Sequence, residues 1–129
     1  MRAVDTNVIV RYLAGDDAEQ ARRAKSLIDQ EDIFVCVTVL LEAEWVLRRL
    51  FGYDRRMVIQ ALRRFAGLEH VTIEDAGPVS EAFDWAERGK DFADALHLAR
   101  TAHLAGFVTF DRGFIRLAGR LAHAKVGQP

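Results

Sequence analysis

The stretch Ala3–Gly15, AVDTNVIVRYLAG, decides the fold class of this 129-residue chain. Its first two residues form a short apolar strand that ends at Asp5 and leads directly into Asn7–Leu13, a segment with helical apolar spacing. Glycine follows, and glycine often ends a helix because it accepts a left-handed backbone. The stretch therefore predicts a strand followed at once by a helix, which is how a parallel βαβ unit begins.

The same alternation continues to the end of the chain. Apolar strands are predicted at 33–37, 71–73 and 107–110. Helices are predicted from Asp17 onward, over 38–50 with Thr38 as N-cap, over 54–66 with Asp54 as N-cap, and over 79–88, 91–105 and 114–121. This order predicts a three-layer α/β/α fold with a central parallel sheet of about five strands. No linker interrupts it, so we expect residues 1–129 to form a single domain.

Composition restricts the setting in which the protein works. Half of the residues are apolar, which suffices for a hydrophobic core without disulfides or a structural metal. The single cysteine, Cys36, lies in an apolar run and is expected to be a small buried hydrophobe in a reducing compartment. Neither a signal peptide nor a run of about 18 apolar residues is present, so the sequence predicts a cytoplasmic protein.

The net charge of -1 is a cancellation between segments of opposite sign. Arg48–Leu68 alone carries six basic residues and one acid, and fifteen of the eighteen basic residues are arginine. Arginine binds phosphate in a bidentate way that lysine cannot match. These arginines either hold a nucleic-acid backbone or lie on solvated helix faces, and the near-neutral total does not argue against nucleic acid.

Two aspartates follow predicted strands directly. Asp5 ends the first strand, and Asp111 ends the strand at 107–110. Ligands of open parallel sheets gather outside the carboxyl ends of the strands, so both are candidate site residues. Each is also explained as an ordinary N-cap of the helix that follows.

A third candidate lies within the helix predicted at 38–50. The helical neighbours of Glu42 at three and four residues include no cation and are mostly apolar, so we expect its carboxylate to face an apolar environment. An ionised carboxylate there is costly unless it is paired, hydrogen-bonded or bound to a metal. Glu44 points to a different side and has Arg48 four residues on, which predicts a structural surface pair.

Asp94 is the fourth candidate, near the start of a predicted helix. Asp91 is the expected N-cap, and Asp94 lies among apolar residues, so it either faces inward or simply favours the positive end of the helix. His97 and His103 lack metal-ligand spacing and are interpreted as helix-surface or filler residues. Four carboxylates without His or Cys partners favour Mg²⁺ or Mn²⁺ and suit attack on a phosphodiester.

At this point the sequence resembles the PIN-domain ribonucleases, and within them the VapC toxins of prokaryotic type II toxin–antitoxin pairs. The resemblance covers essentially the whole chain. It rests on four segments in order: VDTN at 4–7, TVLLEAEWVL at 38–47, DFADALHLA at 91–99 and VTFDRGF at 108–114.

The resemblance implies a set of site residues. The family's acidic quartet falls on Asp5, Glu42, Asp94 and Asp111, which are expected to be catalytic and to bind the metal. Asn7 and Thr109 are expected to assist near the metal. Gly113 departs from the pattern, because many relatives carry a further acid there, so catalysis with one or with two metal ions stays open.

The implied activity is metal-dependent hydrolysis of RNA by in-line attack of activated water. Family members usually form homodimers and are inhibited by a cognate antitoxin protein. A haloacid dehalogenase-type phosphatase is disfavoured because Asn7 replaces its second aspartate, and a phospho-receiver domain is disfavoured by the positions of the three lysines. A PIN-like domain that binds RNA or protein without cleaving it is the remaining alternative.

Overall fold

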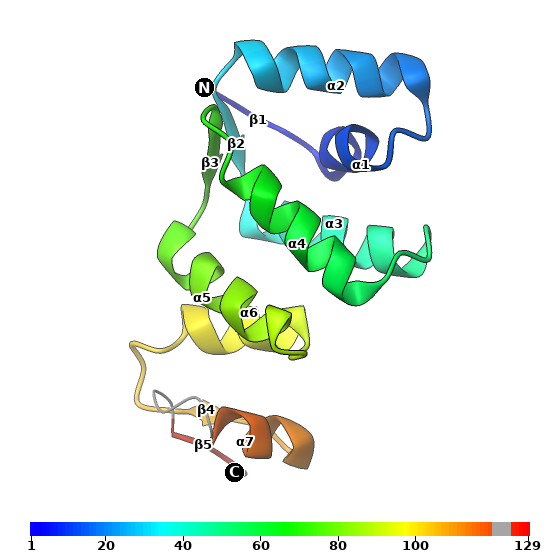
Figure 1. The fold of residues 1–129 in the computed structure, drawn as a ribbon. Helices are drawn as coiled ribbons and strands as arrows, with labels where there is room; N and C mark the ends of the chain where they lie inside the picture. The colour runs from blue at the N-terminus through cyan, green and yellow to red at the C-terminus, as the bar shows by residue number, and fades with distance from the viewer. Residues whose placement is uncertain (120–124) are drawn as a thin grey trace. The chain divides into compact units, whose positions relative to one another are not determined.

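The computed structural model describes residues 1–119 and 125–129 and shows a helix-rich α/β protein whose paired strands are all parallel (Figure 1). The chain divides into two compact units, Met1–Ala76 and Gly77–Pro129. The α/β class is confirmed, and a single domain over 1–129 stays a prediction. Among the described helices, none has the length and apolar character needed to cross a membrane.

The first unit contains a three-stranded parallel sheet. Its strands are β1 (Arg2–Ala3), β2 (Ile33–Val35) and β3 (Val71–Ile73), in the order β1-β2-β3. Ile33 pairs with Arg2 on one side and with Val71 on the other. Because β2 has a neighbour on both sides, its end residues Ile33 and Val35 are completely buried, as expected for a central strand of an α/β protein.

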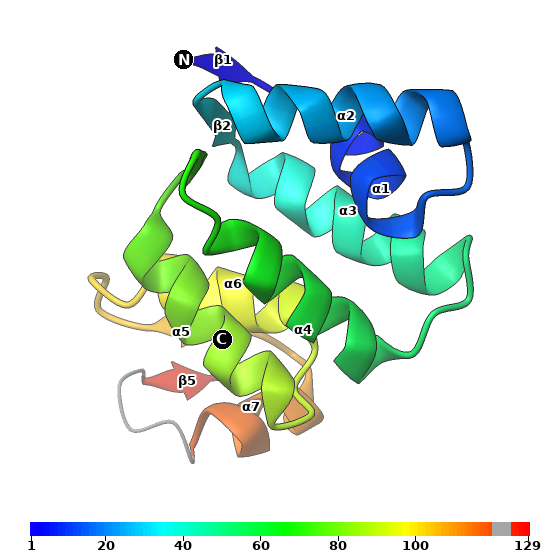
Figure 2. The same ribbon diagram turned by 45° about the horizontal axis from the view of Figure 1, so that its top comes forward.

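Four helices complete the first unit: α1 (Thr6–Ala14), α2 (Ala18–Gln30), α3 (Val37–Arg49) and α4 (Arg55–Ala66). Figures 1 and 2 show α1 between α2 and α3, with α4 on the other side of α3. Gly15 ends α1 in the left-handed conformation with φ of 64°, as predicted. Asp54 caps α4 by accepting a hydrogen bond from the Met57 amide, which confirms the predicted start.

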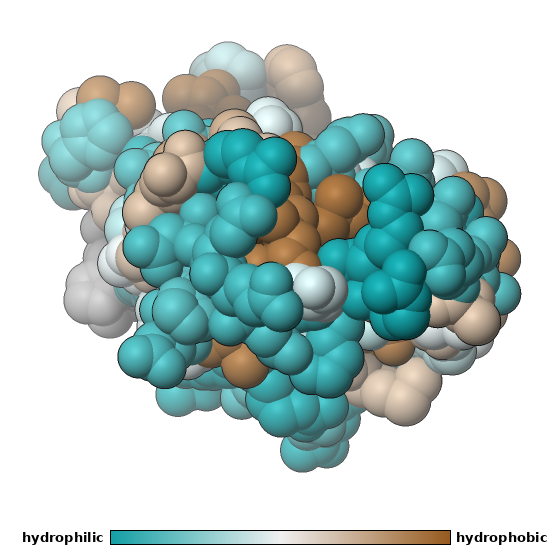
Figure 3. Space-filling view, turned by 90° about the horizontal axis from the view of Figure 1, so that it is seen from above, coloured by the Kyte–Doolittle hydropathy of each residue, from teal (hydrophilic) through white to brown (hydrophobic). Residues whose placement is uncertain are grey.

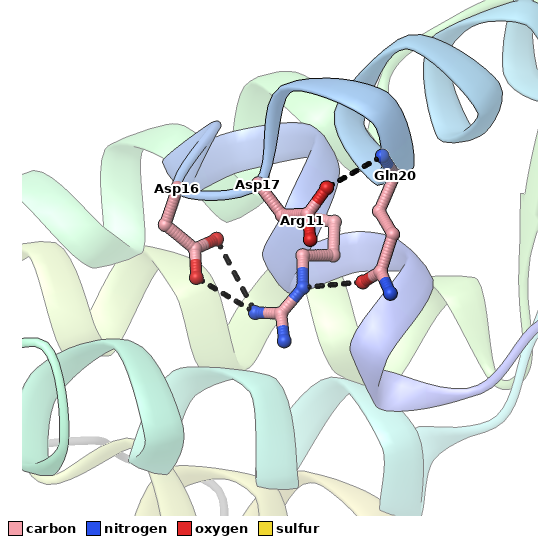
Figure 4. A network of polar contacts seen from close by, with 4 residues as sticks. All are labelled: Arg11, Asp16, Asp17 and Gln20. Carbon is pink, nitrogen blue, oxygen red and sulfur yellow. Dashed lines mark hydrogen bonds and ion pairs between the residues drawn. The ribbon is translucent and has the colours of Figure 1, made fainter.

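A polar network fixes the turn from α1 to α2 (Figure 4). The Arg11 guanidinium donates to both carboxylate oxygens of Asp16, at 2.9 and 3.2 Å, and to Gln20 Oε1 at 2.7 Å. Asp17 caps α2 by accepting from the Gln20 amide at 2.9 Å. The two helices are therefore held together by charge-assisted hydrogen bonds as well as by apolar contact.

The second unit has three helices and a pair of short strands. They are α5 (Ala76–Glu87), α6 (Phe92–Arg100), β4 (Phe107–Val108), α7 (Arg112–Ala118) and β5 (Val126–Gly127). The strands β4 and β5 pair in parallel, and β5 was not predicted. The described chain thus has five strands in two sheets, where one sheet of about five was expected.

Four helix boundaries differ from the prediction by two or more residues, and one of them is the start of α5, which lies at Ala76 and not at residue 79. Thr38 does not cap α3; the N-cap position is Cys36, two residues earlier, and Glu74 Oε1 accepts from the Val37 amide at 2.9 Å. α6 ends at Arg100, because the Thr101 hydroxyl donates to the His97 carbonyl at 2.6 Å and the chain turns. α7 starts at Arg112, and residues 120 and 121 of its predicted span lie outside the described residues.

Candidate functional site

Thr6 connects two of the candidate acids in the first unit. Asp5 follows β1 and caps α1, with its Oδ1 accepting from the Thr6 amide at 2.8 Å. The buried Thr6 hydroxyl donates to Glu42 Oε1 on α3. Asp5 and Glu42 are far apart in the sequence, yet both accept hydrogen bonds from Thr6, one from its amide and the other from its hydroxyl. Both carboxylate side chains are exposed, and their role as site residues stays a prediction.

The expected apolar environment of Glu42 is wrong, because the buried carboxylate of α3 is Glu44. Glu44 is 3 % exposed and its Oε1 accepts from Arg48 Nε at 2.8 Å. The predicted Glu44–Arg48 pair is confirmed, but it is buried and not on the surface. α3 is apolar on most sides, so local spacing does not fix its inward face; packing against α1 and α4 does. Glu42 thus lies on the exposed side.

In the second unit, three carboxylates lie near one another. Asp91 caps α6 by accepting from the Asp94 amide at 3.0 Å. Burial raises the pKa of Asp94, and the negative charges of Asp91 and Asp111 raise this pKa further, while His97 lowers it. A small recess of about 10 Å³ beside Asp94 is lined mostly by apolar side chains of α5, α6 and α7, together with Lys90.

Asp111 follows β4 and caps α7. Its Oδ1 accepts from the Phe114 amide at 3.0 Å, and its own amide donates to Thr109 Oγ1 at 3.0 Å. A Cβ atom at Gly113 would lie 3.2 Å from Asp111 Oδ1, so the glycine leaves room for this carboxylate. The cap interpretations of Asp5 and Asp111 are therefore correct, and their second carboxylate oxygens are not used by these caps.

The remaining predicted site residues are Asn7 in the first unit and Thr109 in the second. Asn7 is exposed in the first turn of α1, and Thr109 is half-buried just before Asp111. His97 and His103 are exposed, so their interpretation as surface residues is confirmed. Within the described residues of either unit, no three His, Cys, Asp or Glu side chains form a group that could hold a metal ion by itself.

The chemistry of the donors fits a hard divalent cation. Asp5, Glu42, Asp94 and Asp111 offer only carboxylate oxygens, which suit Mg²⁺ or Mn²⁺ and not softer metals. The raised pKa of Asp94 shows that its negative charge is disfavoured by its surroundings. A cation beside it would remove that penalty, whereas a proton removes it only at lower pH.

Two functional side chains were missed at the level of sequence. Thr6 was considered only as a possible cap, yet its hydroxyl positions Glu42. Glu74 was not considered, although it follows β3 in the same way that Asp5 follows β1, and it caps α3. A polar residue within three positions of the end of β1 or β3 is the signal that would have found both.

The first unit also has a groove of about 570 Å³ along α1 and α2. Val8, Ala24 and Leu27 contribute its apolar lining, and Figure 3 shows apolar surface recessed between hydrophilic residues. Three of its arginines already bind carboxylates, in the ion pairs Arg2–Glu31, Arg11–Asp16 and Arg22–Glu19 at 2.7 to 2.9 Å. Their charge is therefore largely balanced within the protein.

A chain with parallel strands and carboxylates shortly after β1, β3 and β4 belongs to the α/β proteins that bind ligands beyond the carboxyl ends of their strands. Comparison with known families narrows this class: residues 2–120 match the model of the PIN domain, and the chain belongs to that family. No curated protein matches the chain. PIN domains are nucleases that use divalent metal ions, so the expectation of a PIN-domain nuclease is confirmed.

Proposed function

We propose that this protein is a ribonuclease that depends on Mg²⁺ or Mn²⁺ and serves as the toxin of a type II toxin–antitoxin pair. The observation that carries the nuclease part is the oxygen-only acid set on a PIN domain, with Asp94 held near two like charges. The substrate class and the toxin role are supported by the VapC resemblance of the four sequence segments.

The proposed roles of the acids come from the VapC resemblance. Asp5, Asp94 and Asp111 would hold the cation, and Glu42 would either complete its ligands or orient the attacking water. When bound, the cation would activate water and neutralise charge on the scissile phosphate. Thr6 holds Glu42 by its hydroxyl, and Asn7 and Thr109 would assist beside the carboxylates. Catalysis with one or two metal ions stays open because of Gly113.

The proposed partners are an RNA substrate, a second copy of the chain and a cognate antitoxin, all in the cytoplasm. Arg48–Leu68 supports the RNA assignment, since it carries six basic residues and one acid. Exposed arginines at 49, 55, 56 and 64 are available on α3 and α4 of the first unit. Binding of RNA through such side chains should weaken as salt is added.

Cleavage of RNA by the purified protein, freed of any antitoxin, tests the proposal. We expect hydrolysis with Mg²⁺ or Mn²⁺, inhibition by EDTA, and a loss of rate of about 100-fold or more in Asp5→Asn and in Asp94→Asn. Asp29→Asn, which changes an exposed aspartate of α2 that pairs with Lys25, is the matched control and should keep the rate.

Circular dichroism should show that each variant is folded. Activity that survives both Asp5→Asn and Asp94→Asn would refute the assignment of the acids. A wild-type protein that binds RNA but does not cleave it with either metal would instead support the binding-only alternative.

A further inference from the structure

The outer face of α3 carries a row of exposed side chains that includes Glu42. Thr38, Glu42, Trp45 and Arg49 follow at steps of three and four residues, which places them within an arc of about 60° on one side of the helix. The opposite side buries Val37, Leu40, Ala43, Glu44 and Leu47. The row is therefore the free side of a helix whose other side is fixed in the core.

Trp45 is unusual in this position. Its side chain is 48 % exposed, although tryptophan is normally highly buried. The neighbours in its row are a hydroxyl, a carboxylate and a guanidinium, and Leu41 one turn before it is half-buried, so the row by itself offers no broad apolar centre. A stable interface with a second protein needs such an apolar centre and about 800 Å² on each side. A flat ring with polar neighbours fits a single planar group better.

Arg49 supplies the charge that a nucleic-acid strand requires. It lies one turn beyond Trp45, and among the described residues no ion pair ties it to a carboxylate. This distinguishes Arg49 from Arg2, Arg11 and Arg22, which bind acids around the α1–α2 groove. Along the helix axis, Trp45 is about 4.5 Å and Arg49 about 10.5 Å from Glu42.

We propose that Trp45 is a platform on which an unpaired base of the RNA substrate stacks, with Arg49 binding an adjoining phosphate. The inference rests on the proposed ribonuclease function. It adds that the RNA is single-stranded and that it runs from Glu42 along α3 toward Trp45 and Arg49. Aromatic stacking tolerates any base, and together with cationic side chains it is the usual means of holding single strands.

Binding in EDTA tests this inference without cleavage. Fluorescence anisotropy with a labelled single-stranded RNA of mixed sequence should show Trp45→Ala weakening the affinity roughly 5- to 100-fold. Trp45→Phe keeps a stacking ring and should stay within about threefold. Met57→Ala is the matched control, since Met57 is also 48 % exposed but lies on α4, and it should bind as the wild type does. The corresponding RNA duplex should not distinguish Trp45→Ala from wild type.

Two further measurements separate stacking from a structural role. RNA should quench the fluorescence of Trp45 in the unmodified protein, while Trp85 is 6 % exposed and should not respond. Arg49→Gln should reduce the slope of log affinity against log salt by about 0.7, and Arg22→Gln, which removes a paired arginine, should not. If Trp45→Ala destabilises the fold, the quenching in the unmodified protein decides the question.

Unchanged RNA affinity in a folded Trp45→Ala protein would overturn the inference, as would absent quenching. A dimer that becomes monomeric on Trp45→Ala, measured by light scattering, would assign the face to a second copy instead. If wild type cleaves RNA while Trp45→Ala binds normally, only the stacking platform is wrong. If wild type neither cleaves nor binds RNA, the proposed function is wrong as well.

Discussion

The two units hold their acids in different ways. In the first unit Glu42 accepts a hydrogen bond from the Thr6 hydroxyl, and Asp5 accepts from the Thr6 amide, so protein donors stabilise both carboxylates. In the second unit Asp94 has carboxylates near it, and burial together with these charges raises its pKa. The difference indicates that the first pair is prearranged without a cation, while Asp94 gains most from one.

Removing the donor in the first unit should have the largest effect on stability. Thr6→Val deletes the hydroxyl that binds Glu42, and we expect the free energy of unfolding to fall by about 1–2 kcal/mol. Cleavage should also slow, because Glu42 loses the group that orients it. Chemical denaturation and the cleavage rate would be measured together.

Thr6→Ser is the matched control for this prediction, since it keeps the hydroxyl and should recover most of the cleavage rate. A Thr6→Val protein that is as stable and as active as wild type would show that Glu42 does not depend on Thr6.

Neutralising the acid of the second unit should have a smaller and opposite effect on the metal-free protein. Asp94→Asn removes a disfavoured charge, so we expect a gain of a few tenths of a kcal/mol, reduced by solvent screening because Asp94 is only half-buried. Glu42→Gln should give no gain, because that carboxylate is exposed and already accepts a hydrogen bond. Thermal melts in EDTA would compare the two variants.

The free energy of unfolding should also depend on pH through the carboxyl group of Asp94. The folded pKa of Asp94 lies above its ordinary value of 3.8, so the folded state binds the proton more tightly than the unfolded state. The stabilisation is complete below the unfolded pKa and is lost as pH rises through the folded pKa. Wild type should show this loss in EDTA and Asp94→Asn should not. Equal pH profiles would contradict the account in which burial, and then the nearby charges of Asp91 and Asp111, raise this pKa.

The sequence correctly predicted helix boundaries that are set by a single capping residue. Gly15 and Asp54 act through bonds to residues close in sequence, so they were placed correctly. The Thr38 cap failed because Glu74, 37 residues away, supplies the bond to the Val37 amide. The predicted end of α6 at residue 105 was wrong. The Thr101 hydroxyl competes for backbone carbonyls, an interaction that apolar spacing does not reveal.

Asp5, Asp94 and Asp111 were identified because each follows a strand or lies near the start of a helix, whereas Glu42 was selected for its apolar helical neighbours. The environment of Glu42 was not predictable, since α3 is apolar on most sides and its orientation is set by α1 and α4. The buried pair of Glu44 and Arg48 shows the consequence: spacing identified the partners but not the face. Long-range packing, and not the local pattern, decides which glutamate is buried.

Binding of Mn²⁺, measured by titration calorimetry near neutral pH, tests the central claim most directly, because it needs no knowledge of the RNA target. The account predicts that wild type binds Mn²⁺ and that Asp94→Asn and Asp5→Asn, one variant in each unit, each weaken binding about 10-fold or more. Asp29→Asn should bind as wild type does. Unchanged Mn²⁺ affinity in both Asp94→Asn and Asp5→Asn, with the proteins folded, would contradict the account.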